Sequence, residues 1–349
     1  MAKTQTKPTA EVLELPRTGV RYVGVDDGHS GIKVVTDGVA LHIPARLAEG
    51  SMIELAGAKE DNFYQDESGA TYTVSASLPF LDTRVGTYAT SAANHVLIHH
   101  ALIRAGLAGC DVRIVTGLPV NDFYIAGQQN TDLIDAKITS LASTTIRNRN
   151  ADVQLARIVG HDVYPEAIAA FYDLVMDNDG NPTPVMDQVE RGPIAIVDIG
   201  GKTTDIAVVF NGGTGVDPKR SGSVELGALS LNTAVEMAIK RAMKLDRMST
   251  MQVDEAVSKG TIRLFGSDQD CFDIVKYEKG VLAQQIITEV KRRVGGGSDL
   301  EAVFFVGGGS ALLDDELQDL YRHAVFVEDP QFSNGRGMWK ACKYLLASE

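Results

Sequence analysis

One short pattern occurs twice in this chain: an apolar strand that ends in an acidic residue and runs directly into a glycine-rich turn. The first copy is Val23-Gly-Val-Asp-Asp-Gly-His-Ser-Gly-Ile-Lys33, and the second is Ile194-Ala-Ile-Val-Asp-Ile-Gly-Gly-Lys-Thr-Thr-Asp205. Glycines allow backbone N–H groups to approach an anion closely. Two such turns, far apart in the sequence, predict two similar domains that hold one ligand, with metal-bound phosphate between Asp26 and Asp198.

Composition limits the class of protein. A chain of 349 residues, with 44% apolar and 23% charged residues, can bury a large core and is expected to form two domains of a soluble globular protein. Its net charge of −13 argues against nonspecific binding of nucleic acid. The three cysteines, Cys110, Cys271 and Cys342, fit neither a zinc site nor a disulfide framework, which indicates reduced thiols in the cytoplasm.

Membrane insertion and export are not expected. No apolar run approaches the roughly 20 residues that span a bilayer, and the leader before Pro16 is polar and mixed in charge. We therefore expect residues 1–19 to be a disordered leader.

In the first half, Arg21–Val35 is predicted to form a β-hairpin, and 42–90 a small inserted subdomain. A helix is expected over Ser91–Ala105, a strand over Cys110–Pro119, a helix and strand within 121–150, and a strand over Val153–Val163. Proline is tolerated at a first helical position, so Glu166 is expected in the first turn of a helix that reaches Val175. The stretch Asp177–Gly192 is interpreted as a loop at the domain boundary.

The second half is predicted to repeat the first. A hairpin over Ile194–Phe210 precedes helices over Leu229–Leu245 and Phe272–Arg293. The apolar strand Ala302–Val306 then runs into a third glycine cluster, followed by an expected helix over Leu312–Ala324. One glycine cluster after a strand is a weak signal, but three such elements in this order are much stronger.

These three elements resemble the phosphate-1, phosphate-2 and adenosine motifs of the actin-like ATPases. Within that superfamily the chain is most similar to the plasmid-segregation actins of the ParM/StbA type, over almost all of Arg21–Leu346. The more specific similarities are the acid pair Asp26-Asp27 and the segments Ile98-His-His-Ala-Leu102, Val115-Thr-Gly-Leu-Pro-Val-Asn-Asp-Phe-Tyr124 and Asn334-Gly-Arg-Gly-Met338.

The resemblance implies an α/β, two-domain actin-like (ribonuclease H-like) fold with a nucleotide in the interdomain cleft. Domain I would comprise residues 20–190 joined by 326–349, and domain II residues 191–325. It further implies Mg²⁺-dependent hydrolysis of ATP, or of GTP, coupled to filament assembly for plasmid partition in a bacterial cytoplasm. The expected partners are further copies of the chain and an adaptor protein bound at a centromere-like DNA site, with no direct contact to nucleic acid or membrane.

Individual roles combine this resemblance with the chemistry of phosphate transfer, in which the protein supplies mainly geometry and charge. Asp26 and Asp198 are the candidates for binding hydrated Mg²⁺, which prefers carboxylates through water. Glu166 matches the family's water-polarising residue and, with Asp198, is expected to be catalytic. Lys33 resembles the phosphate-reaching lysine. The other expected nucleotide contacts are Gly28, His29, Ser30, Gly31, Gly200, Gly201, Lys202 and Thr203 at the phosphates and Gly307, Gly308, Gly309 and Ser310 at the base.

Several alternatives stay open at this point. Asp198 and Asp205 could simply cap their turns, and Asp27 could bind metal water in place of Asp26, which is favoured because it is expected to end the strand. Glu166 could be an ordinary acid at a helix start. His29 and Lys202 depart from the residues common in relatives, and His99 and His100, adjacent on a helix, are not expected to bind a metal.

A second functional hypothesis is a small-molecule kinase of the same ATP-binding superfamily. It would need a further acid in the cleft as a base for a substrate hydroxyl, and it would need no filament.

Overall fold

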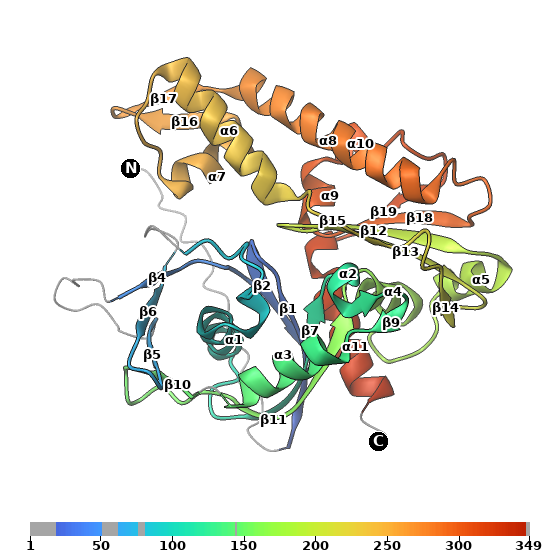
Figure 1. Cartoon of the computed structure of the whole chain (residues 1–349), viewed down its shortest axis with the longest axis horizontal. Coiled ribbons are helices and arrows are strands. Elements are labelled where there is room, and N and C mark those ends of the chain that lie inside the picture. Colours follow the sequence, from blue (N-terminus) through green and yellow to red (C-terminus); the bar gives the residue numbers. More distant parts are fainter. Residues whose placement is uncertain (1–18, 51–61, 76–80, 144, 347–349) are drawn as a thin grey trace, which may run out of the picture.

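The computed structural model describes residues 19–50, 62–75, 81–143 and 145–346. The predicted disordered leader therefore lies, except for Gly19, outside the described residues. Figure 1 shows two α/β regions side by side, with the blue and green first half on one side and the yellow and orange second half on the other.

The first region is built on a five-stranded sheet in the order β11-β7-β1-β2-β3. The strands β1 and β2 form the predicted hairpin, and β7 lies parallel to β1 on its other side. Apolar residues such as Val23, Val25 and Ile32 are fully buried, as expected for central strands. The bounds are β1 (Arg21–Asp27), β2 (Gly31–Thr36), β3 (Val39–Pro44), β7 (Asp111–Leu118) and β11 (Arg157–Pro165).

The second region repeats this sheet, which confirms the duplication at the level of the fold. Its order is β14-β13-β12-β18-β19, in which β12 and β13 form an antiparallel hairpin and β18 lies parallel to β12. Asp26 pairs in register with Lys33, and Asp198 with Asp205. The bounds are β12 (Ile194–Ile199), β13 (Thr204–Phe210), β14 (Gly215–Val216), β15 (Gly222–Val224), β18 (Ala302–Val306) and β19 (Ala324–Phe326).

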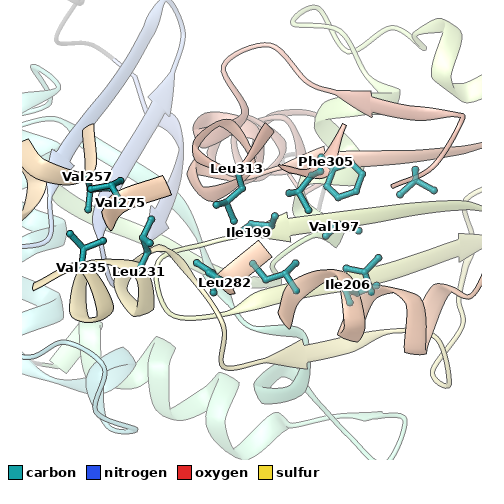
Figure 2. Packing of buried hydrophobic residues seen from close by; sticks show 14 of the residues in the cluster. Val197, Ile199, Ile206, Leu231, Val235, Val257, Val275, Leu282, Phe305 and Leu313 are labelled. Carbon is teal, nitrogen blue, oxygen red and sulfur yellow. The ribbon is translucent and has the colours of Figure 1, made fainter. Parts of the chain in front are cut away.

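Helices cover both sides of the second sheet. Figure 2 shows Val197, Ile199 and Phe305 of the sheet together with Leu231 and Leu282 of the helices on one side of it, and all five belong to one buried hydrophobic cluster. Alternate residues of β12, Ile194 and Ile196, face the opposite side and pack with α4 (Ile168–Val175) and α5 (Pro184–Arg191). The elements on the upper side are α6 (Ala228–Met243), α7 (Thr250–Lys259), α8 (Phe272–Val294) and the hairpin β16 (Thr261–Leu264) with β17 (Ser267–Asp270).

The first region carries its own helices and a second, small sheet. Ser91 caps α1 by accepting a hydrogen bond of 3.2 Å from the Asn94 N–H. Within the predicted subdomain 42–90, the strands β4, β5 and β6 pair with one another and with β10, whereas residues 51–61 and 76–80 lie outside the described residues. The bounds are β4 (Leu47–Glu49), β5 (Phe63–Asp66), β6 (Thr71–Val74), α1 (Ala92–Arg104), α2 (Val120–Phe123), β8 (Tyr124–Ile125), β9 (Gln128–Gln129), α3 (Thr131–Ser143) and β10 (Ile146–Asn148).

Four details differ from the sequence-based expectations. First, Glu166 lies before its helix rather than in the first turn, since α4 (Ile168–Val175) begins only after Ala167. The strand β11 runs through Pro165, and the Glu166 N–H then donates to Leu118 O at 2.8 Å. The expected loop 177–192 contains α5 (Pro184–Arg191), whose cap Thr183 precedes a proline that favours a helix start.

The third and fourth differences concern strand and helix ends. β1 ends at Asp27 rather than Asp26. The expected helix 312–324 is absent from the described chain: α9 (Gly308–Leu312) and α10 (Asp314–Leu317) are separated by the buried Leu313, whose φ of −118° interrupts the helical path.

The C-terminal helix α11 (Ser333–Lys340) packs closely on β1 and α4. It follows the short turn η2 (Pro330–Phe332) and continues into η3 (Ala341–Leu345). Glycines permit the approach: a β-carbon on Gly24 would collide with Gly335 O, and one on Gly337 would collide with Ala169 O. No helix of the described chain is long and apolar enough to cross a membrane.

We expect Gly337→Ala to lower the free energy of unfolding by about 3 kcal/mol, the upper end for an overpacked core, because rigid backbone blocks the methyl group. The matched control is Gly280→Ala in α8, where nothing lies within 4 Å of the added carbon. Alanine there should raise stability by about 0.5–1 kcal/mol. Denaturant unfolding of both variants measures this, and equal stability of the two would contradict the packing account.

Candidate active site

The two glycine turns, one from each region, lie against each other. Gly28–Ser30 joins β1 to β2, and Gly200–Thr203 joins β12 to β13. A β-carbon on Gly201 would lie 2.7 Å from Ser30 Oγ and 2.9 Å from Ser30 N. The structure thus brings together the turns that the sequence pattern paired.

Buried acids converge beneath these turns. Asp26 and Asp198, at the ends of β1 and β12, are 6% and 3% exposed. Lys33 Nζ lies 3.2 Å from Asp26 Oδ2. Burial lowers the pKa of Lys33, but the negative charges of Asp26, Asp198 and Glu166 outweigh it, and the pKa is raised.

Burial and neighbouring negative charges raise the pKa of acids in the cleft. Burial, followed by the charge of Asp205, raises the pKa of Asp198 to about 7. Burial, followed by the charges of Asp205, Asp26 and Asp198, also raises the pKa of Glu166 well above its ordinary value. The cleft therefore holds more negative charge than its own side chains neutralise, and an added cation would relieve this excess.

Asn334, at the start of α11, connects the two acids that the sequence placed at the reaction centre. Its Nδ2 donates to Asp198 Oδ2 at 2.6 Å, and its Oδ1 accepts from the Ala167 N–H, next to Glu166, at 3.1 Å. In the sequence, the segment 334–338 indicates only a similarity to the ParM/StbA type and gives Asn334 no role in the site. The site role of Asn334 was missed because it depends on contacts across more than 130 residues of sequence.

Asp27 has a different environment from Asp26. Its carboxylate accepts from Lys137 Nζ at 2.8 Å and 3.0 Å and from Asn94 Nδ2 at 2.8 Å. Burial raises the pKa of Asp27, but Lys137 more than offsets this, so the pKa is lowered. Asp27 is an ionised brace behind the turn, and Lys137 is a second residue that the sequence analysis did not identify.

Asp205 joins the second turn to the first region. Its carboxylate accepts from the Val120 N–H at 2.7 Å, from Thr203 Oγ at 2.7 Å and from Ser223 Oγ at 2.5 Å. The Thr203 hydroxyl is thus a donor to Asp205. The backbone of the turn is fixed to residues on both sides of the cleft.

His29 and Lys202, the two turn residues that differ from those common in relatives, each contact a neighbouring residue. His29 Nδ1 lies 2.7 Å from Thr83 O, and burial lowers its pKa to about 4, so the ring is neutral at pH 7 and donates to that carbonyl. Lys202 Nζ lies 3.4 Å from Glu225 Oε1. His29 therefore adds no charge to the first turn, whereas Lys202 adds one to the second.

The third glycine cluster lies beside the end of β12. A β-carbon on Gly307 would collide with Asp198 Oδ1, and one on Gly309 would lie 2.9 Å from Ile199 O. Gly308 is more open, with its nearest such contact at 3.6 Å from Gln331. The Ser310 hydroxyl donates to Gly307 O at 2.8 Å and so stabilises the turn itself.

A cavity of about 500 Å³ opens from the first turn between the two regions. Its walls include His29, Ser30 and His42 on one side and Leu229 and Asn232 of α6 on the other. Two contacts join its sides: Arg46 with Asp254 at 2.5 Å, and Arg84 Nη1 with Thr233 Oγ at 3.3 Å. A volume of 300–1,000 Å³ is typical of small-molecule sites.

The donor set fits a hydrated divalent cation better than a directly coordinated one. The described residues contain no group of three acidic, histidine or cysteine side chains placed to bind a metal ion. Mg²⁺ commonly keeps several waters and uses one or two carboxylates together with phosphate oxygens. Asp26 and Asp198, with the surplus negative charge described above, suit that mode.

Comparison with known proteins gives two family matches. Residues 22–177 match the family described as plasmid segregation protein ParM, N-terminal, and residues 196–319 match the archaeal actin homologue MreB-like, C-terminal family. No curated protein matches the chain.

Solved structures of actin homologues have the same fold. A 15-stranded ParM filament from Clostridium botulinum is 19% identical, with a TM-score of 0.77 over 93% of this chain and 99% of that one. The archaeal actin homologue Ta0583 in complex with ADP is 19% identical, with a TM-score of 0.73 over 92% and 98% of the two chains. The actin-like protein Alp7A is 13% identical, with a TM-score of 0.72 over 93% and 96%. The chain therefore has the two-domain actin fold. Its first part matches the ParM N-terminal family model, and its second part matches the archaeal MreB-like C-terminal model.

Proposed function

We propose that this protein is an actin-like ATPase that assembles into filaments with nucleotide bound and disassembles after hydrolysis. The observation that carries the proposal is the convergence of two duplicated turns and their buried acids at one interdomain site. The ParM-type match of residues 22–177 supports plasmid segregation as the task of the filaments. By the same likeness we propose a bacterial cytoplasmic location and a link to plasmid DNA through a separate adaptor protein.

ATP with Mg²⁺ is the proposed ligand. The cation would be held through water by Asp26 and Asp198 and would neutralise charge on the phosphates. The backbone N–H groups of the two turns, from Gly28 to Gly31 and from Gly200 to Thr203, would bind phosphate oxygens, and Gly307, Gly308 and Gly309 would support the base.

Glu166 is the proposed base. Its carboxyl lies against the end of β7, where a β-carbon on Gly117 would be 3.2 Å from Glu166 Oε1. As a carboxylate it would accept a proton from the attacking water while Lys33 supplies positive charge to the phosphates. Asp198 would orient the metal waters, held in place by Asn334.

The direct test is light scattering of the purified protein after addition of Mg²⁺-ATP, with phosphate release followed in the same sample and ADP as the control. Scattering should rise with ATP and decay as phosphate appears. Glu166→Gln, which keeps size and polarity, should still assemble but release phosphate on the order of 10²- to 10⁴-fold more slowly. An absence of ATP-dependent scattering across a wide range of protein concentration would contradict the filament proposal, and wild-type hydrolysis by Glu166→Gln would remove Glu166 from the mechanism.

Asp198→Asn should have two effects of opposite sign. It should weaken the binding of Mg²⁺-ADP on the order of 10- to 100-fold, as removal of a group that orients metal ligands does. It should also stabilise the nucleotide-free protein at neutral pH. The folded protein keeps the Asp198 proton up to pH about 7, whereas the unfolded chain loses it near the ordinary value, so this carboxyl costs stability as pH rises from about 4 to 7.

Denaturant unfolding of wild type and Asp198→Asn at pH 4, 6 and 8 measures the stability effect, and calorimetric titration measures affinity. The two proteins should be close in stability at pH 4 and diverge by about 1.4 kcal/mol for each unit of pKa shift. A constant difference across this range would contradict the raised pKa, and unchanged Mg²⁺-ADP affinity would contradict the metal-water role.

A further inference from the structure

We propose that Lys137 is a positioning residue for hydrolysis: its ammonium group locks Asp27 and the Gly117 carbonyl together and thereby fixes Glu166 relative to the first phosphate turn. This inference rests on the proposed function, because it takes Glu166 to act on water. Lys137 lies in the middle of α3, far from both glycine turns in the sequence.

The ammonium group is completely engaged by two partners. Lys137 Nζ donates to Asp27 Oδ1 at 3.0 Å, to Asp27 Oδ2 at 2.8 Å and to Gly117 O at 2.5 Å. A lysine has three N–H donors, and these acceptors account for all of them. The Lys137 and Asp27 side chains are only 2% and 3% exposed, so bulk solvent hardly screens these contacts.

The Gly117 peptide groups are held from both sides. The Gly117 N–H donates to Asp27 Oδ1 at 3.3 Å, while its carbonyl accepts from Lys137. This glycine and its neighbour form the surface on which Glu166 rests: the Glu166 N–H donates to Leu118 O at 2.8 Å, and its side chain passes Gly117. A shift of the β7 end would therefore move Glu166.

A small polar cavity occupies the same place. It measures about 50 Å³, and its walls include Asp27, Gly117, Lys137 and Glu166. A water molecule needs only about 10–15 Å³ of such space and several polar partners. The residues that Lys137 holds in place thus line a space with room for at least one water beside Glu166.

Stability alone does not account for this ion pair. Replacing a buried ion pair with apolar residues of similar volume is often neutral or stabilising, because both charges must be desolvated. An apolar pair could not donate to Gly117 O or fix its distance from Asp27. The Lys137–Asp27 pair thus serves to fix the position of the Gly117 carbonyl.

The test compares Lys137→Met with Lys340→Met in steady-state ATP hydrolysis and thermal melting. Lys340 is a matched control: its ammonium is also buried, and it donates to Asp173 Oδ1 at 2.7 Å, Asp173 O at 3.1 Å and Met176 O at 2.7 Å, none of which lines either cavity. Both variants should melt at a lower temperature. Only Lys137→Met should lose kcat, on the order of 10- to 100-fold, with the KM for ATP within about twofold of wild type because ground-state binding is intact.

The double variant Asp27→Asn with Lys137→Met separates geometry from charge balance and keeps the test valid if Lys137→Met does not fold. It removes both charges, so its melting temperature should recover, but kcat should stay low because Gly117 O still lacks its donor. Recovery of kcat in the double variant, or wild-type kcat in Lys137→Met, would overturn the positioning role. An inactive wild-type protein would instead overturn the proposed function, and this inference with it.

Discussion

The structure depends on keeping several carboxyl groups buried close together. Asp26, Asp27, Asp198, Asp205 and Glu166 influence one another electrostatically, and burial removes the water that would otherwise screen them. Lys137 neutralises Asp27. Backbone and hydroxyl donors hold Asp205, but burial still leaves its pKa raised. Glu166, Asp198 and Asp205 thus all have raised pKa values, which is the condition under which a bound cation would stabilise the fold.

Repetition of one supersecondary unit creates this arrangement. Each sheet presents an antiparallel hairpin whose tip is a glycine turn, flanked by a parallel strand. The register differs at one informative pair: Lys33 stands opposite Asp26, whereas Asp205 stands opposite Asp198. Beside the first turn, Asp26 is thus paired with a lysine, whereas beside the second turn Asp205 accepts a hydrogen bond from the Val120 N–H across the cleft. α11 completes the site, since Asn334 bridges Asp198 and the residue after Glu166.

Sequence patterns predicted the elements whose formation depends mainly on residues close to one another in the chain. Both hairpins, the helices α1, α6 and α8 and the acids at the strand ends follow from periodicity and turn chemistry. The solved structures confirm the expected two-domain actin fold, and the ParM N-terminal model matches residues 22–177. The start of α4 was placed wrongly because Leu118 of β7 pairs with the end of β11 and accepts a hydrogen bond from the Glu166 N–H, which keeps this segment extended. Lys137 and Asn334 were missed for the same reason, because their partners are distant in sequence. From its neighbours alone, Lys137 resembles a surface lysine of a helix and Asn334 resembles a turn residue.

In the proposed mechanism, both glycine turns hold the same nucleotide. Hydrogen exchange measured during a titration with Mg²⁺-ADP tests it most directly, because each turn reports through its own amides. Residues 28–31 and 200–203 should become protected together, at the same ligand concentration, with slower exchange also at Ala167, whose N–H donates to Asn334. Protection of one turn without the other, or of neither, would contradict it.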